Sequence, residues 1–190
     1  MISVSAKWKE AYPDASFGVL VIEGVQNGKW NRQLDTKREL LEERIRTQYS
    51  GKSKKEIRAE PLFAEYQRYF RKFGQNYPVL LQLETVALKG RPIRSPSPLV
   101  ASMFMAELES GLLTAGHDFD SLETPLHLAI AEGEERYVTM DGTERILKKG
   151  DMFFSDQKGV LSSVLYGPDN RSMITKDTSR VLFTVYGHPL

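Results

Sequence analysis

The spacing of the apolar residues changes once along this chain, near residues 111–120, and this change restricts the folds available to it. Between residues 34 and 113 the apolar residues recur every three or four positions, which is the period of amphipathic helices. After residue 120 they form short runs separated by glycine-containing turns, a pattern typical of strands. Because helices and strands are grouped instead of alternating, the pattern predicts an α+β fold.

Four helices are predicted in the first part of the chain. Prolines at the start of two of them and glycines at residues 74 and 90 mark boundaries. The predicted helices span residues 34–46, 61–73, 78–89 and 99–113. In the last helix, Glu107 and Glu109 are expected on the exposed face. The proline-rich residues 91–98 are expected to form an extended connector.

The strands are predicted mainly in the second part of the chain. One early run, Phe17–Val25, is rich in β-branched residues without strict alternation, so we expect a strand covered on both faces. The other predicted strands are Leu126–Ala131, Arg136–Met140, Asp151–Phe154, Val160–Tyr166 and Val181–Tyr186. A chain of 190 residues without a linker-like segment is expected to form a single domain over residues 1–190.

The composition excludes several kinds of site. The chain has no cysteine, which rules out a disulfide framework, a thiolate nucleophile and a cysteine-based zinc site. Its three histidines are separated and lack metal-binding spacing, so we expect no metal and no cofactor. Without a signal-peptide pattern or a membrane-length apolar run, a cytoplasmic protein that does not bind membranes is expected.

Charge is distributed unevenly along the chain, although the formal net charge is only +1. Residues 37–94 carry a net charge of +7, from fourteen basic and seven acidic residues, whereas residues 95–157 carry −8, from four and twelve. A basic face of this kind could bind nucleic-acid phosphates. Its candidate members are Lys52, Lys54, Lys55, Arg58, Arg68, Arg71 and Lys72. The alternative, favoured by the pattern alone, is a solvated helix face with internal ion pairs.

An aromatic stripe lies within the same basic region, in the predicted helix over residues 61–73. Its members are Phe63, Tyr66, Tyr69, Phe70 and Phe73. Stacking on nucleic-acid bases is one use for such a stripe. The helical spacing favours packing in the core instead.

His117 is the histidine whose neighbours best suit catalysis. Gly116 before it would allow close approach of a ligand to the backbone, and Asp118 or Asp120 could fix the tautomer of the imidazole. Ester hydrolysis needs such a group to remove a proton from water, together with donors for the oxyanion. The alternative is that His117 only terminates the preceding helix.

Several blocks of the sequence together resemble a known domain. The blocks are Arg68–Gly74, Leu88–Gly90, Ser97–Val100, Ala115–Asp118, Asp151–Asp156 and Ile174–Phe183. In this order they are similar to the B3/B4 domain, which occurs in the β subunit of bacterial phenylalanyl-tRNA synthetase and as freestanding proteins. The similarity runs through most of residues 15–188. It implies helices packed on a mixed β-sheet or β-sandwich core.

The resemblance also implies a function and a site. In the synthetase this domain edits, hydrolysing tyrosine wrongly esterified to the phenylalanine tRNA. His117 matches a histidine at the editing pocket, so His117 and Asp118 are the predicted catalytic residues. The predicted substrate-binding residues are Gly116, Gly167, Asp169, Arg171, Thr184 and Tyr186. Asp120, Thr175 and Thr178 match further positions of the family pattern.

Two departures from the family pattern weaken the prediction of tyrosine as substrate. The apolar segment Met103–Ala106 replaces a region that carries an asparagine in the synthetase, and Thr184 stands where the synthetase has the glutamate that recognises the tyrosine hydroxyl. A site that pairs with a substrate hydroxyl can discriminate against the analogue without it by about 10⁴-fold. Without the glutamate, this chain lacks the group that would select tyrosine by its hydroxyl.

The predicted function is therefore that of a freestanding, tRNA-binding B3/B4-like domain that deacylates a mischarged aminoacyl-tRNA, with the tRNA 3′ end as partner. A non-catalytic RNA-binding or amino-acid-binding module that keeps the pocket is the first alternative. A hydrolase or transferase acting on an unrelated small molecule is the second, because a fold does not determine its substrate.

Overall fold

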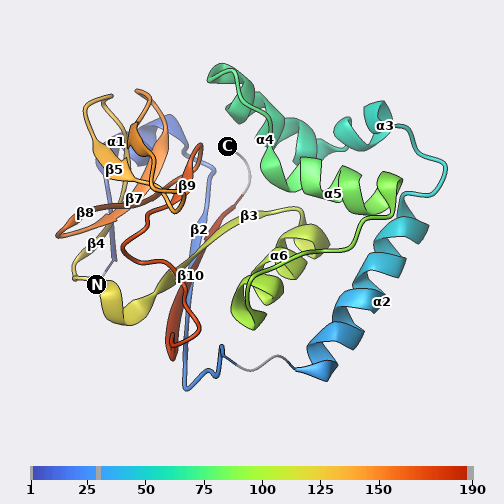
Figure 1. Cartoon of the computed structure of the whole chain (residues 1–190). Helices are drawn as coiled ribbons and strands as arrows, with labels where there is room; N and C mark the ends of the chain where they lie inside the picture. Colours follow the sequence, from blue (N-terminus) through green and yellow to red (C-terminus); the bar gives the residue numbers. More distant parts are fainter. Residues whose placement is uncertain (1, 29–30, 188–190) are drawn as a thin grey trace.

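The computed structural model describes residues 2–28 and 31–187 and has the predicted α+β architecture. Figure 1 shows α2 to α6 on one side of the molecule and most of the short strands on the other, with β2, β3 and β10 between them. The helices are α1 (Ala6–Ala11), α2 (Arg32–Gln48), α3 (Lys54–Arg58), α4 (Pro61–Lys72), α5 (Pro78–Lys89), α6 (Pro98–Ser110) and the 3-10 helix η1 (Phe119–Ser121). Among these described helices, none is long and apolar enough to cross a membrane.

The strands form three sheets within the described residues. They are β1 (Ile2–Val4), β2 (Phe17–Glu23), β3 (Leu113–Asp118), β4 (Leu126–Ile130), β5 (Arg136–Val138), β6 (Glu144–Ile146), β7 (Met152–Asp156), β8 (Gly159–Ser163), β9 (Gly167–Pro168) and β10 (Arg180–Tyr186). One sheet has the order β1-β4-β7-β8-β9, a second the order β2-β10-β3, and β5 pairs with β6. Within the first sheet β1 runs parallel to β4 and the other pairs are antiparallel, so the sheet is mixed.

The prediction of a helix over residues 99–113 is wrong at the C-terminal end. It stops at Ser110, and Gly111 adopts a left-handed conformation with φ of 72° while its N–H bonds to the carbonyl of Glu107. The chain then enters β3, which pairs antiparallel with β10 from Leu113 to Asp118. His117 therefore lies within a strand and does not terminate a helix.

The expectation that Phe17–Val25 is covered on both faces is also wrong. The strand β2 is the edge of its sheet, paired along its whole length with β10. Its residues Val19, Leu20, Val21 and Ile22 are exposed by 36% to 54%. A run of β-branched residues is equally compatible with an edge strand, which is why the pattern alone did not separate the two cases.

The aromatic stripe of α4 lies in the core. Phe63, Tyr66, Tyr69 and Phe70 are at most 4% exposed, which confirms the packing interpretation and leaves these rings unavailable to bases. The ring of Tyr66 stacks on that of Tyr77 at the start of α5, with centroids 4.4 Å apart and an angle of 5°.

The hydroxyl of Tyr66 joins this helical layer to the three-stranded sheet. It donates to the carbonyl of Tyr186 in β10 and accepts from the N–H of Leu113 in β3, at 3.3 Å. Leu113 and Tyr186 are paired residues at one end of the β3–β10 ladder. The hydroxyl thus bridges the last pair of the ladder from α4.

Removing this hydroxyl tests the junction. We expect Tyr66→Phe to lower the free energy of unfolding by about 2 kcal/mol, because the buried N–H of Leu113 loses its partner. Urea denaturation monitored by circular dichroism measures the change. Tyr166→Phe is the control and should stay within about 0.5 kcal/mol, since its hydroxyl has no hydrogen-bond partner among the described residues. Equal losses in the two variants would contradict the role of Tyr66.

Candidate functional site

A largely apolar cavity of about 750 Å³ lies between the helical layer and the strands. Its walls come from the first turns of α5, one face of α6, the first residues of β3 and the segment that joins β8 to β9. The lining residues are Pro78, Val79, Gln82, Pro96, Val100, Met103, Phe104, Glu107, Leu113, Thr114, Ala115, Gly116, Met140, Ser163, Val164, Leu165, Tyr166, Gly167, Pro168, Met173, Ile174 and Tyr186. A cavity of this size and character suits a small organic ligand.

Three residues predicted to bind substrate line this cavity, namely Gly116, Gly167 and Tyr186. At Gly116 an added Cβ would approach Ile174 Cδ1 to 2.8 Å and the ring of Phe183 to 3.0 Å, so a larger residue there would force these side chains to shift. Gly167 has φ of 78°, a conformation that favours glycine. Both positions bring bare backbone to the cavity wall.

Glu107 is a cavity residue that the sequence analysis placed on the exposed face of its helix. The residue is only 5% exposed, so the expectation of an exposed glutamate is wrong. Its Oε1 accepts hydrogen bonds from the backbone N–H of Thr114 at 2.9 Å and from the Thr114 hydroxyl at 2.8 Å. Burial raises the pKa of the Glu107 carboxyl to about 7, although the bonds from Thr114 act in the opposite direction.

The contact between Glu107 and Thr114 explains why the helical pattern failed. The chain reverses at Gly111, and β3 returns beside the last turn of α6. Two donors from Thr114 then meet a glutamate that an isolated helix would expose to water. A signal was available in the sequence, because Glu107 directly follows the apolar segment Met103–Ala106.

His117, a predicted catalytic residue, has no exposed surface and does not belong to the cavity lining. Its Nδ1 lies 2.7 Å from the hydroxyl of Ser172, which bonds in turn to the Asp169 carboxylate. Its Nε2 has no hydrogen-bond partner among the described residues. Burial, with a smaller contribution from Arg171, lowers the pKa of the imidazole to about 3 against the opposing effect of Asp156. The ring is therefore neutral near pH 7.

Asp169 and Arg171, both predicted to bind substrate, are engaged with other side chains instead of lining the cavity. The Arg171 guanidinium makes two hydrogen bonds to the Asp156 carboxylate, at 2.9 and 3.0 Å, and one to the carbonyl of Ser121 at 3.0 Å. Its Nε lies 3.5 Å from Asp169. These bonds tie the loop after β9 to β7 and η1.

Asp118 and Thr184 are likewise outside the cavity lining. One oxygen of Asp118 accepts from the Thr178 hydroxyl at 2.6 Å, and the other accepts from the Asp120 N–H at 3.1 Å, where it caps η1. Thr184 is fully buried on β10, and its hydroxyl lies 3.5 Å from the carbonyl of Ala115. Successive strand residues face opposite sides, so Asp118 and His117 point away from each other.

Most of the seven predicted phosphate-binding cations have partners within the protein. Lys52 pairs with Glu60 at 2.8 Å, Arg68 pairs with Glu65, and Arg58 makes two bonds to Glu84 at 2.5 and 3.0 Å. The remaining contacts are Lys54 to Glu84 at 3.9 Å, Arg71 to Gln67 at 3.3 Å, and the Lys72 amine over the rings of Tyr12 and Tyr69. Lys55 is exposed and has no such partner among the described residues.

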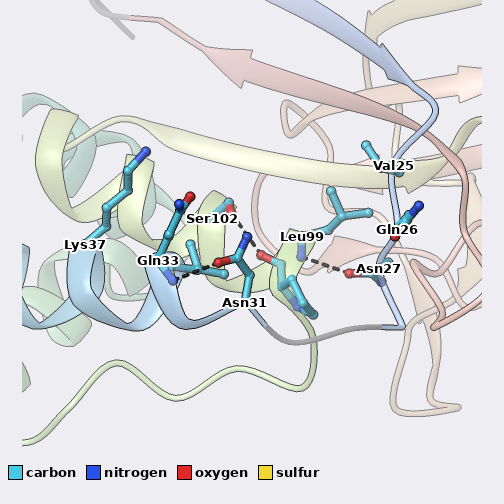
Figure 2. Close-up of a pocket in the computed structure, with 10 residues that line it drawn as sticks. Val25, Gln26, Asn27, Asn31, Gln33, Lys37, Leu99 and Ser102 are labelled. Atoms are coloured by element: carbon cyan, nitrogen blue, oxygen red, sulfur yellow. Dashed lines mark hydrogen bonds between the residues drawn. The ribbon is translucent and has the colours of Figure 1, made fainter.

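A second cavity, of about 660 Å³, is polar and lies where the segment after β2 meets the first turns of α2 and α6 (Figure 2). Asn31 accepts from the N–H of Gln33 at 2.7 Å, and Asn27 accepts from the N–H of Leu99 at 2.9 Å. Among the described residues around it, Lys37 carries the one charge. None of the predicted site residues belongs to its lining.

The neutral state of His117 can be checked directly. We expect its ring NMR signals, assigned by comparison with His117→Gln, to stay unchanged between pH 5 and 8, because burial holds the pKa at about 3. The stability gained from burying the neutral ring is present above the unfolded pKa of 6.5 and is lost as the pH falls from there toward 3. A titration with its midpoint between pH 6 and 7 would show instead that the ring reaches solvent.

Comparison with known proteins places most of the chain in one family. A sequence model described as "B3/4 domain" matches residues 65–189. The chain is 32% identical over 90 residues to the phenylalanine–tRNA ligase β subunit of Tropheryma whipplei (strain Twist), and 31% identical over 106 residues to that of Corynebacterium jeikeium (strain K411). These alignments cover 47% and 56% of this chain but only 9% and 12% of the relatives.

A solved structure is similar over nearly the whole chain. It is an N-terminal fragment of the phenylalanyl-tRNA synthetase β subunit from Pyrococcus horikoshii, with a TM-score of 0.49 and 15% identity over 98% of this chain and 43% of the fragment. The family match itself spans more than half of the residues, including β3 to β10 and most of α4. The chain belongs to the B3/4 domain family.

Proposed function

We propose that this protein binds the aminoacylated 3′ end of a tRNA in the cavity between α6 and β9 and hydrolyses the aminoacyl ester. The observation that carries the proposal is the largely apolar cavity, whose size suits an aminoacyl group. Its position within a B3/4 domain, together with relatives that are β subunits of phenylalanine–tRNA ligase, supports an aminoacyl-tRNA as the substrate class. The proposed setting is the cytoplasm, where aminoacyl-tRNAs are made and used.

Ester hydrolysis in this cavity would use the polar groups of its walls. Thr114, Ser163 and Tyr186 supply hydroxyl groups, and Gly116 and Gly167 bring backbone close to a bound ligand. Such groups can orient a water molecule and stabilise the oxyanion that forms at the ester carbonyl. The sequence-based prediction that His117 and Asp118 are catalytic stays a prediction, and neither residue belongs to the cavity lining. The burial of His117 favours a positioning role, in which the ring holds β3 against the loop that carries Ser172.

Contacts with the tRNA backbone are proposed for Lys52, just before α3, and for the basic residues of α3 and α4. Lys55 has no partner among the described residues, and the exposed pairs of Lys52 and Arg68 cost little to rearrange toward phosphates. Binding through such contacts weakens as the salt concentration rises. The basic residues would hold the tRNA, while the cavity holds its aminoacyl group.

A non-catalytic binding module is the second candidate. The neutral, enclosed ring of His117 favours it, because this predicted general base does not reach the cavity. Such a module would bind an aminoacyl ligand without turnover.

A deacylation screen against a full set of correctly and wrongly charged tRNAs, run at two salt concentrations, tests the proposed function. We expect at least one aminoacyl-tRNA to be deacylated, with a lower rate at high salt. Absence of turnover with every substrate would reject the hydrolase and leave the binding module.

A variant that fills the cavity links any activity to this site. We expect Met103→Trp to lower the deacylation rate at least about tenfold, since the indole occupies the space of the ligand side chain. Ala106→Trp is the matched control, because Ala106 lies on the exposed side of the same helix, outside the cavity lining. If both variants keep the wild-type rate, hydrolysis occurs elsewhere on the protein.

A further inference from the structure

The charges around the apolar cavity are strongly asymmetric. Among the described residues that line it, Glu107 alone carries a carboxyl group, and none carries a lysine, arginine or histidine side chain. A carboxylate or phosphate inside the cavity would therefore have no cationic partner and would stand close to an acid. A positively charged or hydrogen-bond-donating group would have the Glu107 carboxyl group as its partner.

The hydrogen bonds of Glu107 leave one oxygen available for a ligand. Both bonds from Thr114 go to Oε1, and no described residue donates to Oε2. The residue Glu107 is only 5% exposed, so a charge on its carboxyl group is poorly solvated in the absence of a ligand. Burial raises the pKa of the carboxyl, because it disfavours the charged form. A bound ammonium group would supply a positive partner and favour the ionised carboxylate.

The remaining walls select the rest of the ligand. Val79, Met103, Phe104, Leu165 and Ile174 present aliphatic, thioether and aromatic groups to the cavity. These walls favour an apolar side chain, and methionine side chains adapt to different shapes. A ligand that fits both features has an amino group, a large apolar side chain and no free carboxylate.

We propose that Glu107 binds the amino group of an aminoacyl ester whose apolar side chain fills the cavity, so that the site accepts an esterified amino acid and excludes the free one. This inference rests on the proposed function for the identity of the ligand. It adds a specificity-determining residue on α6 and explains how the product would leave. Hydrolysis releases a carboxylate, which has no cationic partner in the lining and lies near Glu107.

The structure also suggests a variant that removes the charge while keeping the shape. In Glu107→Gln, the side-chain amide oxygen can still accept both hydrogen bonds from Thr114. Glu109→Gln is the matched control on the same helix, because Glu109 is exposed and pairs with Arg44 on the surface. An unchanged circular dichroism spectrum and unfolding midpoint would show that the variants keep the fold.

Calorimetric titration of the whole chain with stable ligand analogues tests the inference. The probes are L-phenylalaninamide and L-leucinamide, their N-acetyl forms, and free L-phenylalanine and L-leucine. We expect at least one amide to bind about 10- to 100-fold more tightly than both its N-acetyl form and its free acid. The preference over the N-acetyl form should disappear in Glu107→Gln and persist in Glu109→Gln.

Several outcomes would overturn the inference. These are equal binding of an amide and its N-acetyl form, tighter binding of the free acids, unchanged amide binding by Glu107→Gln, and absence of binding by either amide. The result is separable from that of the deacylation screen. Amine-dependent binding without any deacylation would support the role of Glu107 and reject the hydrolase. Deacylation that Glu107→Gln leaves unchanged would support the hydrolase and reject the role of Glu107.

Discussion

The hydroxyl of Tyr66 connects the helical layer to the strands, and the geometry of the cavity depends on this connection. It bridges the backbone of Leu113 and Tyr186 at the end of the β3–β10 ladder. Stacked beside it, Tyr77 donates its hydroxyl to the carbonyl of Gly111 at 2.7 Å. The two tyrosines therefore hold the turn where α6 ends and β3 begins. Because these hydrogen bonds are buried, the turn has little freedom to shift.

The position of this turn determines the chemistry of the cavity. It places Thr114 beside the last turns of α6, where its two donors hold the Glu107 carboxylate under an apolar wall. A second buried polar group, His117, lies on the same strand outside the cavity lining, and its Nδ1 contacts the Ser172 hydroxyl, which bonds to Asp169. One strand thus carries a residue that lines the cavity and holds Glu107, and another that contacts Ser172 away from it. Among the described lining residues, Glu107 is the single acid within largely apolar walls, an arrangement that fits an amine with an apolar body.

Much of the fold follows from local patterns, whereas the cavity chemistry depends on long-range contacts. The apolar period predicted α2, α4 and α5, and the short runs predicted β4, β7, β8 and β10, because each pattern reflects which side of an element is buried. The strand β3 was missed because Leu112 and Leu113 extend the helical period past Gly111. Gly116 was identified as bare backbone beside His117, and Gly167 and Tyr186 through the family resemblance; all three line the cavity. Glu107 was not identified as a cavity residue, because it is buried only when β3 folds back beside the end of α6.

We propose that the cavity between α6 and β9 holds an aminoacyl group by its amino end, beside Glu107. The most direct measurement is a crystal structure of the protein with L-phenylalaninamide or L-leucinamide bound. The account predicts the ligand side chain among Met103, Phe104 and Ile174, with its amino group about 3 Å from the Glu107 carboxylate. A ligand bound in the polar cavity near Asn27 and Lys37, or with its amino group directed away from Glu107, would contradict it.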